Sequence, residues 1–257
     1  MLSGGKSRVR RSLVRSTYLA AKLLFGQGLE RTQAKHDDAA VLTIADVMVE
    51  APSDGGVADP MSWFAEPGPF ELEIGCGKGG FLLHRARANP ELRFLGIEWK
   101  NEYFRYTADR MARWAIRNVR VMRTDAAHFV RAQLPADCVS ILHLYHPDPW
   151  PKKRHHKRRL VQPDFVRAVS RCLLPSGLWL IQSDHAEYFQ QIEEAIGANL
   201  VFRRIPWDDA WNEAGADDDW SGTNFEIKYR REGRAIHRAA YELLADRQAT
   251  ADSVGIG

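Results

Sequence analysis

From Phe70 onward, the sequence alternates between short apolar runs of strand-like residues and longer segments with helical spacing. This alternation predicts an α/β fold with a doubly wound, mostly parallel sheet and helices on both faces. The expected strands are residues 71–74, 93–98, 119–123, 139–145, 178–182, 200–205 and 224–229. The expected helices are residues 81–88, 102–116, 163–174, 186–196 and 235–244. Ligands bind beyond the carboxyl ends of the strands in such sheets, so the loops after the strands should hold the chemistry.

The chain of 257 residues is long enough for one such domain with short additions. We expect the domain at residues 70–245, after a basic arm (1–34) and a lead-in segment with a loop (35–69), and before a flexible tail (246–257). The first 25 residues carry six cations and no acid. This composition fits an arm that contacts nucleic acid, a solvated helix, or an organelle transit peptide.

The three cysteines, Cys76, Cys138 and Cys172, are far apart and form no C-x-x-C pair. We therefore expect neither a disulfide framework nor a metal site, and interpret each cysteine as a small apolar residue in a reduced, cytoplasmic protein. No apolar run approaches the ~20 residues of a membrane helix, so no membrane partner is expected.

The first expected strand ends in a glycine-rich loop, Glu73-Ile74-Gly75-Cys76-Gly77-Lys78-Gly79. We assign Gly75, Gly77 and Gly79 to cofactor binding, because glycines allow the backbone to turn tightly against a ligand. The spacing also satisfies the dinucleotide fingerprint, so an NAD-dependent oxidoreductase is an alternative. Glu73 argues against a dinucleotide, since its carboxylate would repel a pyrophosphate. It would suit the ammonium group of S-adenosylmethionine, directly or through water.

Two further carboxylates follow the next two expected strands. Glu98 can accept two hydrogen bonds from ribose hydroxyls, and Asp125 can accept one from an adenine amino group. Glu98 could instead be an exposed acid at a helix start, and Asp125 could cap the next helix.

The loop after residues 139–145 begins with Pro147-Asp148-Pro149-Trp150-Pro151, in which three prolines stiffen the backbone. This stiffness should hold Asp148 near the transferred group. Trp150 could pack under the loop or stack on a base. Six cations follow within eight positions: Lys152, Lys153, Arg154, Lys157, Arg158 and Arg159. A solvated surface would explain such a run, but its place beside the site favours contacts with nucleic-acid phosphates.

These motifs together resemble the bacterial tRNA (guanine-N7)-methyltransferase family over about residues 70–240. The matching segments are 73–79 (EIGCGKG), 96–98 (GIE), 147–155 (PDPWPKKRH), 157–160 (KRRL), 183–184 (SD) and 223–226 (TNFE), followed by Gly233. The resemblance implies a Rossmann-like, class I methyltransferase dependent on S-adenosylmethionine. It implies cofactor contacts by Glu73, Glu98, Asp125 and Asp148, and contacts to tRNA or guanine by Lys152, Asp184, Thr223, Asn224, Phe225 and Glu226. The family's target is a guanosine in the variable loop of tRNA.

Guanine N7 carries a lone pair and no proton, so its methylation needs positioning more than a general base. Asp148 is the expected catalytic residue, because a carboxylate can stabilise the positive charge that develops on the ring. Asp184 and Glu226 could accept hydrogen bonds from guanine N1–H and N2–H₂, and Thr223 could support that pocket. The alternatives are a methyltransferase of exocyclic amines and a non-catalytic RNA-binding protein that keeps the methyltransferase fold.

Overall fold

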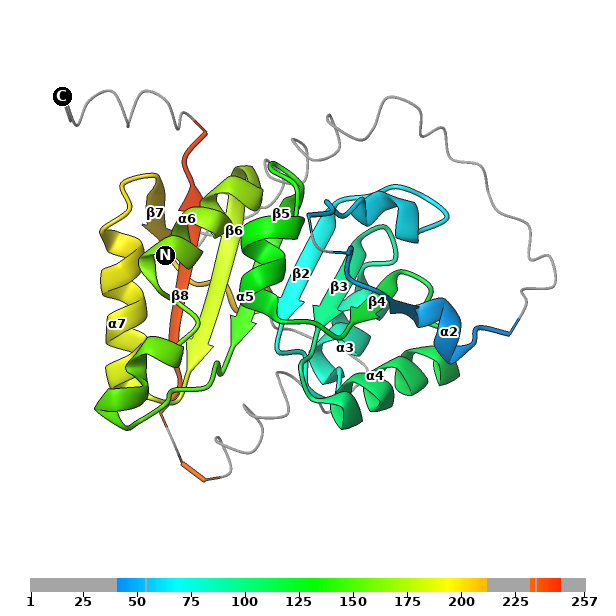
Figure 1. Cartoon of the computed structure of the whole chain (residues 1–257), viewed down its shortest axis with the longest axis horizontal. Helices are drawn as coiled ribbons and strands as arrows, with labels where there is room; N and C mark the ends of the chain where they lie inside the picture. Colours follow the sequence, from blue (N-terminus) through cyan, green and yellow to red (C-terminus); the bar gives the residue numbers. More distant parts are fainter. Residues whose placement is uncertain (1–40, 54, 212–231, 234, 246–257) are drawn as a thin grey trace, which may run out of the picture.

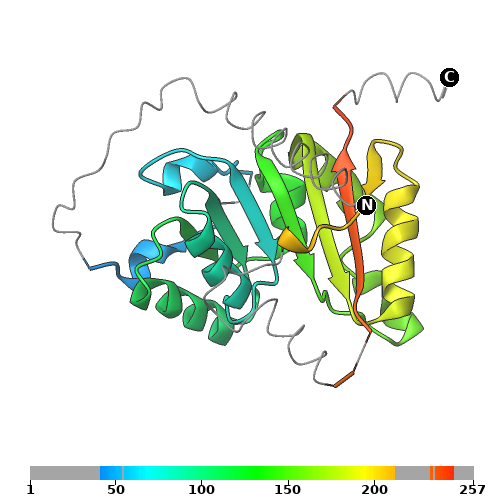
Figure 2. The same cartoon turned by 180° about the vertical axis from the view of Figure 1, so that it is seen from behind.

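The computed structural model describes residues 41–53, 55–211, 232–233 and 235–245. The basic arm, the expected strand at 224–229, the tail, and Thr223, Asn224, Phe225 and Glu226 lie outside the described residues. Within them, one eight-stranded sheet has the order β1-β4-β3-β2-β5-β6-β8-β7. Figure 1 shows α6 and α7 at the β6–β8 end of the sheet and α3 and α4 at the β3–β4 end, and Figure 2 shows the same arrangement from behind.

Strands β2 to β7 lie close to where the sequence predicts them, whereas β1 and β8 were not predicted as strands. They are β1 (Met48–Val49), β2 (Phe70–Ile74), β3 (Arg93–Ile97), β4 (Val119–Met122), β5 (Val139–Tyr145), β6 (Leu173–Ser183), β7 (Phe202–Ile205) and β8 (His237–Leu243). The helices are α2 (Ile44–Val47), α3 (Gly80–Ala88), α4 (Asn101–Arg113), α5 (Ala126–His128), α6 (Pro163–Cys172) and α7 (Ala186–Gly197). Shorter turns are η1 (Pro60–Trp63), η2 (Phe129–Gln133), η3 (Lys153–Arg158) and η4 (Asp209–Trp211).

The sheet is parallel from β1 through β6, and β8 runs antiparallel between β6 and β7. The chain proceeds outward from β2 to β3 and β4 on one side and to β5 and β6 on the other. The strand order therefore reverses between β2 and β5, and ligands bind at such a switch point. The predicted doubly wound α/β fold is confirmed.

The prediction of a helix over residues 235–244 is wrong. This segment forms β8, which pairs with both β6 and β7. Ala239, Tyr241 and Leu243 join the core on one face, while Ala240 packs on the other. Alanine and leucine favour helices locally, but a position between two strands, buried on both faces, outweighs that preference.

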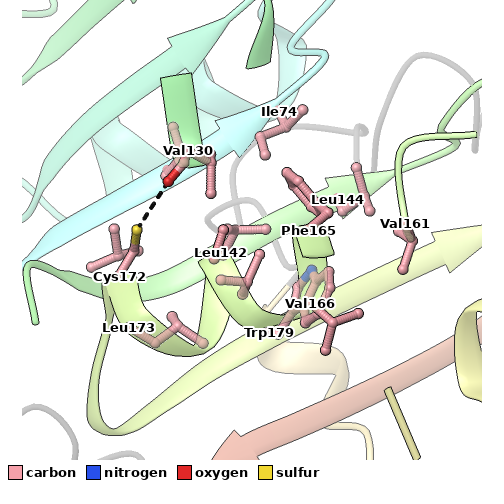
Figure 3. Packing of buried hydrophobic residues seen from close by; sticks show 14 of the residues in the cluster. Ile74, Val130, Leu142, Leu144, Val161, Phe165, Val166, Cys172, Leu173 and Trp179 are labelled. Carbon is pink, nitrogen blue, oxygen red and sulfur yellow. Dashed lines mark hydrogen bonds between the residues drawn. The ribbon is translucent and has the colours of Figure 1, made fainter. Parts of the chain in front are cut away.

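Among the described residues, three apolar clusters pack on the sheet, and the two larger ones bury α6 and the pair α3 and α4. One contains Phe165 and Val166 of α6, packed on Leu142 and Trp179 of β5 and β6 (Figure 3). The other joins α3 and α4 to β3 and β4. Cys172 is buried in the first of these two clusters, where its thiol donates to the Val130 carbonyl at 3.4 Å, and Cys76 is buried in the second. Both cysteines are thus buried, as predicted, whereas Cys138 is only partly buried.

A buried polar network ties β2, α3 and β5 together. Arg85 of α3 donates two hydrogen bonds to the Glu71 carboxylate, at 2.6 and 2.8 Å. His143 Nε2 lies 2.8 Å from the same carboxylate, and His143 Nδ1 lies 2.8 Å from the Tyr145 hydroxyl. Burial would raise the pKa of Glu71, but the charge and hydrogen bonds of Arg85, with those of His143, lower it to about 2.

Arg85→Ala should therefore be strongly destabilising, because it leaves the Glu71 carboxylate buried without its cation. We expect a loss of roughly 3–5 kcal/mol in the free energy of unfolding, measured by urea titration. Arg113→Ala is the control: it removes an exposed ion pair with Asp109 and should cost less than about 1 kcal/mol. Equal losses for the two variants would contradict the role of the network.

Candidate active site

A pocket of about 430 Å³ lies beyond the carboxyl ends of β2, β3, β4 and β5, at the switch point of the sheet. Among the residues that line it are six predicted from the sequence: Gly75, Gly77, Glu98, Asp125, Asp148 and Arg158. The loops after four different strands therefore converge on one cavity, as the fold class requires.

The glycine loop presents bare backbone to this pocket. Gly75 and Gly77 have φ angles of +75° and +55°, which disfavour other residues. A side chain at either position would meet no atom within 4 Å, so both glycines leave open space on the pocket side. Gly79 differs: a Cβ there would collide with Thr107 Cγ2 of α4. Gly79 thus serves the packing of α3 on α4, and its predicted contact with a cofactor stays a prediction.

The Glu98 carboxylate is fixed by the backbone at the end of β3. It accepts hydrogen bonds from the N–H groups of Gly77, at 2.9 Å, and Lys100, at 2.8 Å. Glu98 is only 8% exposed although it lines the pocket. The carboxylate is therefore already oriented for hydroxyl groups of a ligand.

Glu73 lies on β2 directly before the glycine loop, is 4% exposed and is not itself among the residues that line the pocket. Its Oε2 has no hydrogen-bond partner among the described residues. Burial, and then the charge of Glu98, raise the pKa of Glu73 to about 8. Ionisation of Glu73 would place two carboxylates beside each other, and this negative centre would be stabilised by an ammonium group.

Asp125 follows β4 and fills one of its two predicted roles, the cap of the next helix. Its side chain accepts a hydrogen bond from the His128 N–H at 3.0 Å and so caps α5. It is also exposed and lines the pocket. Its second oxygen can still accept a hydrogen bond from a ligand.

The loop after β5 brings Asp148 to the pocket wall in a tightly specified conformation. His146 and Trp150 have φ angles of +51° and +43°, which are unfavourable for these side chains. The backbone N–H of His146 donates to the Gln182 carbonyl at 2.8 Å. His146 Nδ1 lies 3.4 Å from the Asp184 carboxylate, so Asp184 contacts the Asp148 loop. Trp150 lines the pocket and is only partly buried, so it is not part of the core.

The expectation that Arg159 contacts tRNA phosphates needs correction. Arg159 is 2% exposed, and its guanidinium donates to the Pro149 carbonyl at 2.7 Å and to Gln191 Oε1 at 2.6 Å. It also pairs with Glu187 at 3.3 Å. Since these partners occupy the guanidinium inside the fold, Arg159 positions the Asp148 loop and cannot reach a phosphate.

The other five cations of the run are exposed: Lys152, Lys153, Arg154, Lys157 and Arg158. Lys152 precedes η3, and the remaining four lie on it. Arg158 stacks over the Trp150 ring with 5.0 Å between its guanidinium carbon and the ring centre. The run thus forms a cationic surface directly beside the pocket.

Several pocket residues were not predicted from the sequence. Trp99, Lys100 and Tyr103 line the pocket on the β3 side, and Tyr145 and His146 line it on the β5 side. Trp99 and Lys100 directly follow Glu98, so their place after a strand end was a usable signal. Tyr103 gave no such signal, because it lies one turn into α4 and its exposure depends on how that helix packs.

A family model described as "Putative methyltransferase" matches residues 67–239. The tRNA (guanine-N(7)-)-methyltransferase of Nitrosococcus oceani is 36% identical over 175 residues, which cover 68% of this chain and 72% of the relative. The enzyme of the same name from Halorhodospira halophila is 32% identical, covering 74% and 82%, and that of Alkalilimnicola ehrlichii is 39% identical, covering 75% and 80%. The chain belongs to this tRNA (guanine-N(7)-)-methyltransferase family. The resemblance inferred from its motifs is confirmed.

For a member of this family, the pocket residues fit S-adenosylmethionine as the methyl donor. The unpartnered, buried Glu73 Oε2 suits the ammonium of its methionine part. The open backbone at Gly75 and Gly77 leaves room for the chain of the ligand. The oriented Glu98 carboxylate suits the two ribose hydroxyls. A dinucleotide pyrophosphate would instead meet the negative centre of Glu73 and Glu98.

Among the described residues, no group of three or more His, Cys, Asp or Glu side chains is arranged to hold a metal ion. Within the same residues, no helix is long and apolar enough to cross a membrane.

Glu73→Gln should remove the pH dependence of stability that Glu73 imposes on the free protein. The pKa of Glu73 is raised from its ordinary value near 4.5 to about 8, so the folded state holds a proton that the unfolded state has lost. Stability should therefore fall as the pH rises from about 4.5 through 8. The Gln variant should lose this decline and melt above the wild type at pH 8, while losing binding of S-adenosylhomocysteine. Parallel melting curves across that pH range would contradict the role of Glu73.

Arg159→Ala should weaken methyl transfer without changing the salt dependence of tRNA binding. The substitution leaves the Pro149 carbonyl without its buried donor, which we expect to cost about 1–3 kcal/mol of stability and to loosen the Asp148 loop. Fluorescence anisotropy with labelled tRNA at several salt concentrations measures the slope. A slope reduced by about 1 would show instead that Arg159 neutralises a phosphate.

Proposed function

We propose that this protein transfers the methyl group of S-adenosylmethionine to N7 of a guanosine in the variable loop of tRNA, in the cytoplasm. One observation carries the proposal: the buried Glu73, with an oxygen that has no hydrogen-bond partner among the described residues, directly precedes the lining residues Ile74 and Gly75, and Asp148 lines the same pocket beside an exposed cationic run. A cationic methyl donor suits the first feature, and a polyanionic substrate suits the second.

Three groups of the chain hold the cofactor in this proposal. Glu73 binds the ammonium, Glu98 binds the ribose and Asp125 accepts a hydrogen bond from the adenine amino group. Bound S-adenosylmethionine supplies an electrophilic methyl group. Glu98 is held by two backbone N–H groups before any ligand arrives, so little reorganisation is needed on binding.

Asp148 acts on the guanine. N7 has a free lone pair, so no side chain has to remove a proton before the methyl group is transferred. The ring becomes positively charged as the new bond forms, and the Asp148 carboxylate stabilises that charge. Arg159 and the φ-strained His146 and Trp150 hold Asp148 in place, which supports catalysis by positioning.

The substrate is held by the residues that follow β5 and β6. Lys152, Lys153, Arg154, Lys157 and Arg158 contact tRNA phosphates, and Asp184 accepts hydrogen bonds from the guanine edge. Glu226, supported by Thr223, Asn224 and Phe225, completes the guanine pocket by family resemblance. Asp184 already contacts His146 of the Asp148 loop, which links base recognition to the catalytic residue.

The direct test is methyl transfer from labelled S-adenosylmethionine to an unmodified tRNA transcript, followed by nucleoside analysis. We expect the label in 7-methylguanosine, and a loss of at least about 100-fold in rate for Asp148→Ala and Asp148→Asn. Asp109→Asn, which removes an exposed carboxylate on α4, is the matched control and should keep the wild-type rate. Label in an exocyclic-amine product, or none despite cofactor binding, would overturn the proposal.

Lys152→Ala tests the phosphate contact separately. The variant should bind S-adenosylhomocysteine as well as the wild type does, and should bind tRNA more weakly with a salt slope smaller by about 1. An unchanged salt slope in the anisotropy titration would remove Lys152 from the phosphate contacts.

A further inference from the structure

A second exposed surface borders the pocket, across from the basic run. It consists of Lys78, Trp99, Lys100, Tyr103, Tyr106 and Arg123, which we call the aromatic rim. These residues belong to the glycine loop, to the end of β3 with the start of α4, and to the end of β4. In Figure 1, β3 and β4 lie on one side of β2 and β5 lies on the other. Since residues of the rim and Arg158 of the basic run all line the pocket, the two surfaces border it from opposite sides of this switch point.

The cations of the rim rest on its aromatic rings. Lys78 Nζ lies 5.8 Å from the ring centre of Tyr103 and 5.9 Å from that of Tyr106. Lys100 Nζ lies 5.5 Å from Tyr103, and the Arg123 guanidinium lies 5.9 Å from Trp99. Such contacts orient the cations but leave their charge unneutralised.

The cations of the rim differ in this respect from the exposed arginines Arg113 and Arg131. In the part of the chain that the structure describes, no carboxylate forms an ion pair with Lys78, Lys100 or Arg123. Arg113 and Arg131, which lie elsewhere on the surface, pair with Asp109 at 2.6 Å and with Asp164 at 3.1 Å. The positive charges of Lys78, Lys100 and Arg123 therefore remain available at the pocket edge, where they favour a polyanion.

The aromatic rings of the rim are unusually exposed for their size. Trp99 is 65% exposed and Tyr106 is 45% exposed. Unpaired bases stack on such rings, while neighbouring cations follow the sugar–phosphate backbone. A double helix would offer the rings no exposed base face except at its ends. The combination therefore fits unpaired nucleotides better than a duplex.

We propose that the aromatic rim binds unpaired nucleotides of the tRNA on one side of the target guanosine, while the basic run binds phosphates on the other side. The proposal rests on the tRNA methyltransferase function above. The RNA strand leaves a guanosine bound in the pocket in two directions. In this arrangement, the nucleotides on both sides of the guanosine contact cations. Trp99, Lys100 and Tyr103 also line the cofactor pocket, whereas Lys78, Tyr106 and Arg123 do not. The last three residues therefore isolate the contact with RNA.

The test measures tRNA affinity against salt concentration by fluorescence anisotropy, in saturating S-adenosylhomocysteine. Lys78→Ala/Arg123→Ala should reduce the salt slope by about 1–2, because two cations stop displacing counterions. Tyr106→Ala should weaken tRNA binding about tenfold and leave the salt slope unchanged, because a stacking contact releases no counterion.

Arg113→Ala/Arg131→Ala is the matched control. It removes the same amount of charge from exposed positions that are already paired with carboxylates, so it should leave the salt slope at the wild-type value. Isothermal titration with S-adenosylhomocysteine should give the same affinity for all four proteins.

Equal salt slopes for the rim variant and the control would overturn the proposal. So would losses of cofactor affinity that match the losses of tRNA affinity, since the rim would then belong to the cofactor site alone. These outcomes are separable from failure of the proposed function, which is a wild type that binds tRNA but forms no 7-methylguanosine. The rim experiment measures tRNA binding without methyl transfer. It therefore tests the rim whether or not the proposed function is correct.

Discussion

Glu73 lies near the end of β2, buried beside Glu98, with one carboxyl oxygen that has no hydrogen-bond partner among the described residues, and the free energy needed to ionise it there governs the rest of the site. Burying a carboxylate without a partner opposes folding, and here it raises the pKa of Glu73 to about 8. The glycines above it leave open space, and the Glu98 carboxylate is held by backbone N–H groups. A cationic ligand would stabilise the ionised form of Glu73 and occupy that space. The free pocket therefore already has the charge preference and the room that such a ligand needs.

Two glutamates of the same strand, Glu71 and Glu73, have different roles: one is structural and the other serves the site. Glu71 and Glu73 are two residues apart on β2, and both are buried. Glu71 has Arg85 and His143 as partners and a pKa lowered to about 2, whereas an oxygen of Glu73 has no partner and its pKa is raised. The paired carboxylate fastens α3 and β5 to β2. The unpaired one is available to a ligand that those same elements position.

Much of this arrangement follows from local sequence patterns. The glycine loop and the strand-end carboxylates Glu98, Asp125 and Asp148 could be predicted because a parallel sheet brings the loops after its strands together. Three features could not. β8 is rich in helix-forming residues and becomes a strand only through its neighbours. Arg159 belongs to a basic run, but its side chain points into the fold. The aromatic rim depends on how α4 packs. Tertiary contacts determine both the direction of the Arg159 side chain and the position of the rim.

The most direct test of this account is the number of protons exchanged when S-adenosylhomocysteine binds at pH 7. Isothermal titration in buffers with different ionisation enthalpies gives that number. If Glu73 is protonated in the free protein and ionised against the ligand ammonium, binding should release close to one proton, and the release should decline as the pH rises past about 8. Binding with no proton release at pH 7 would contradict the claim that this carboxylate holds the cofactor.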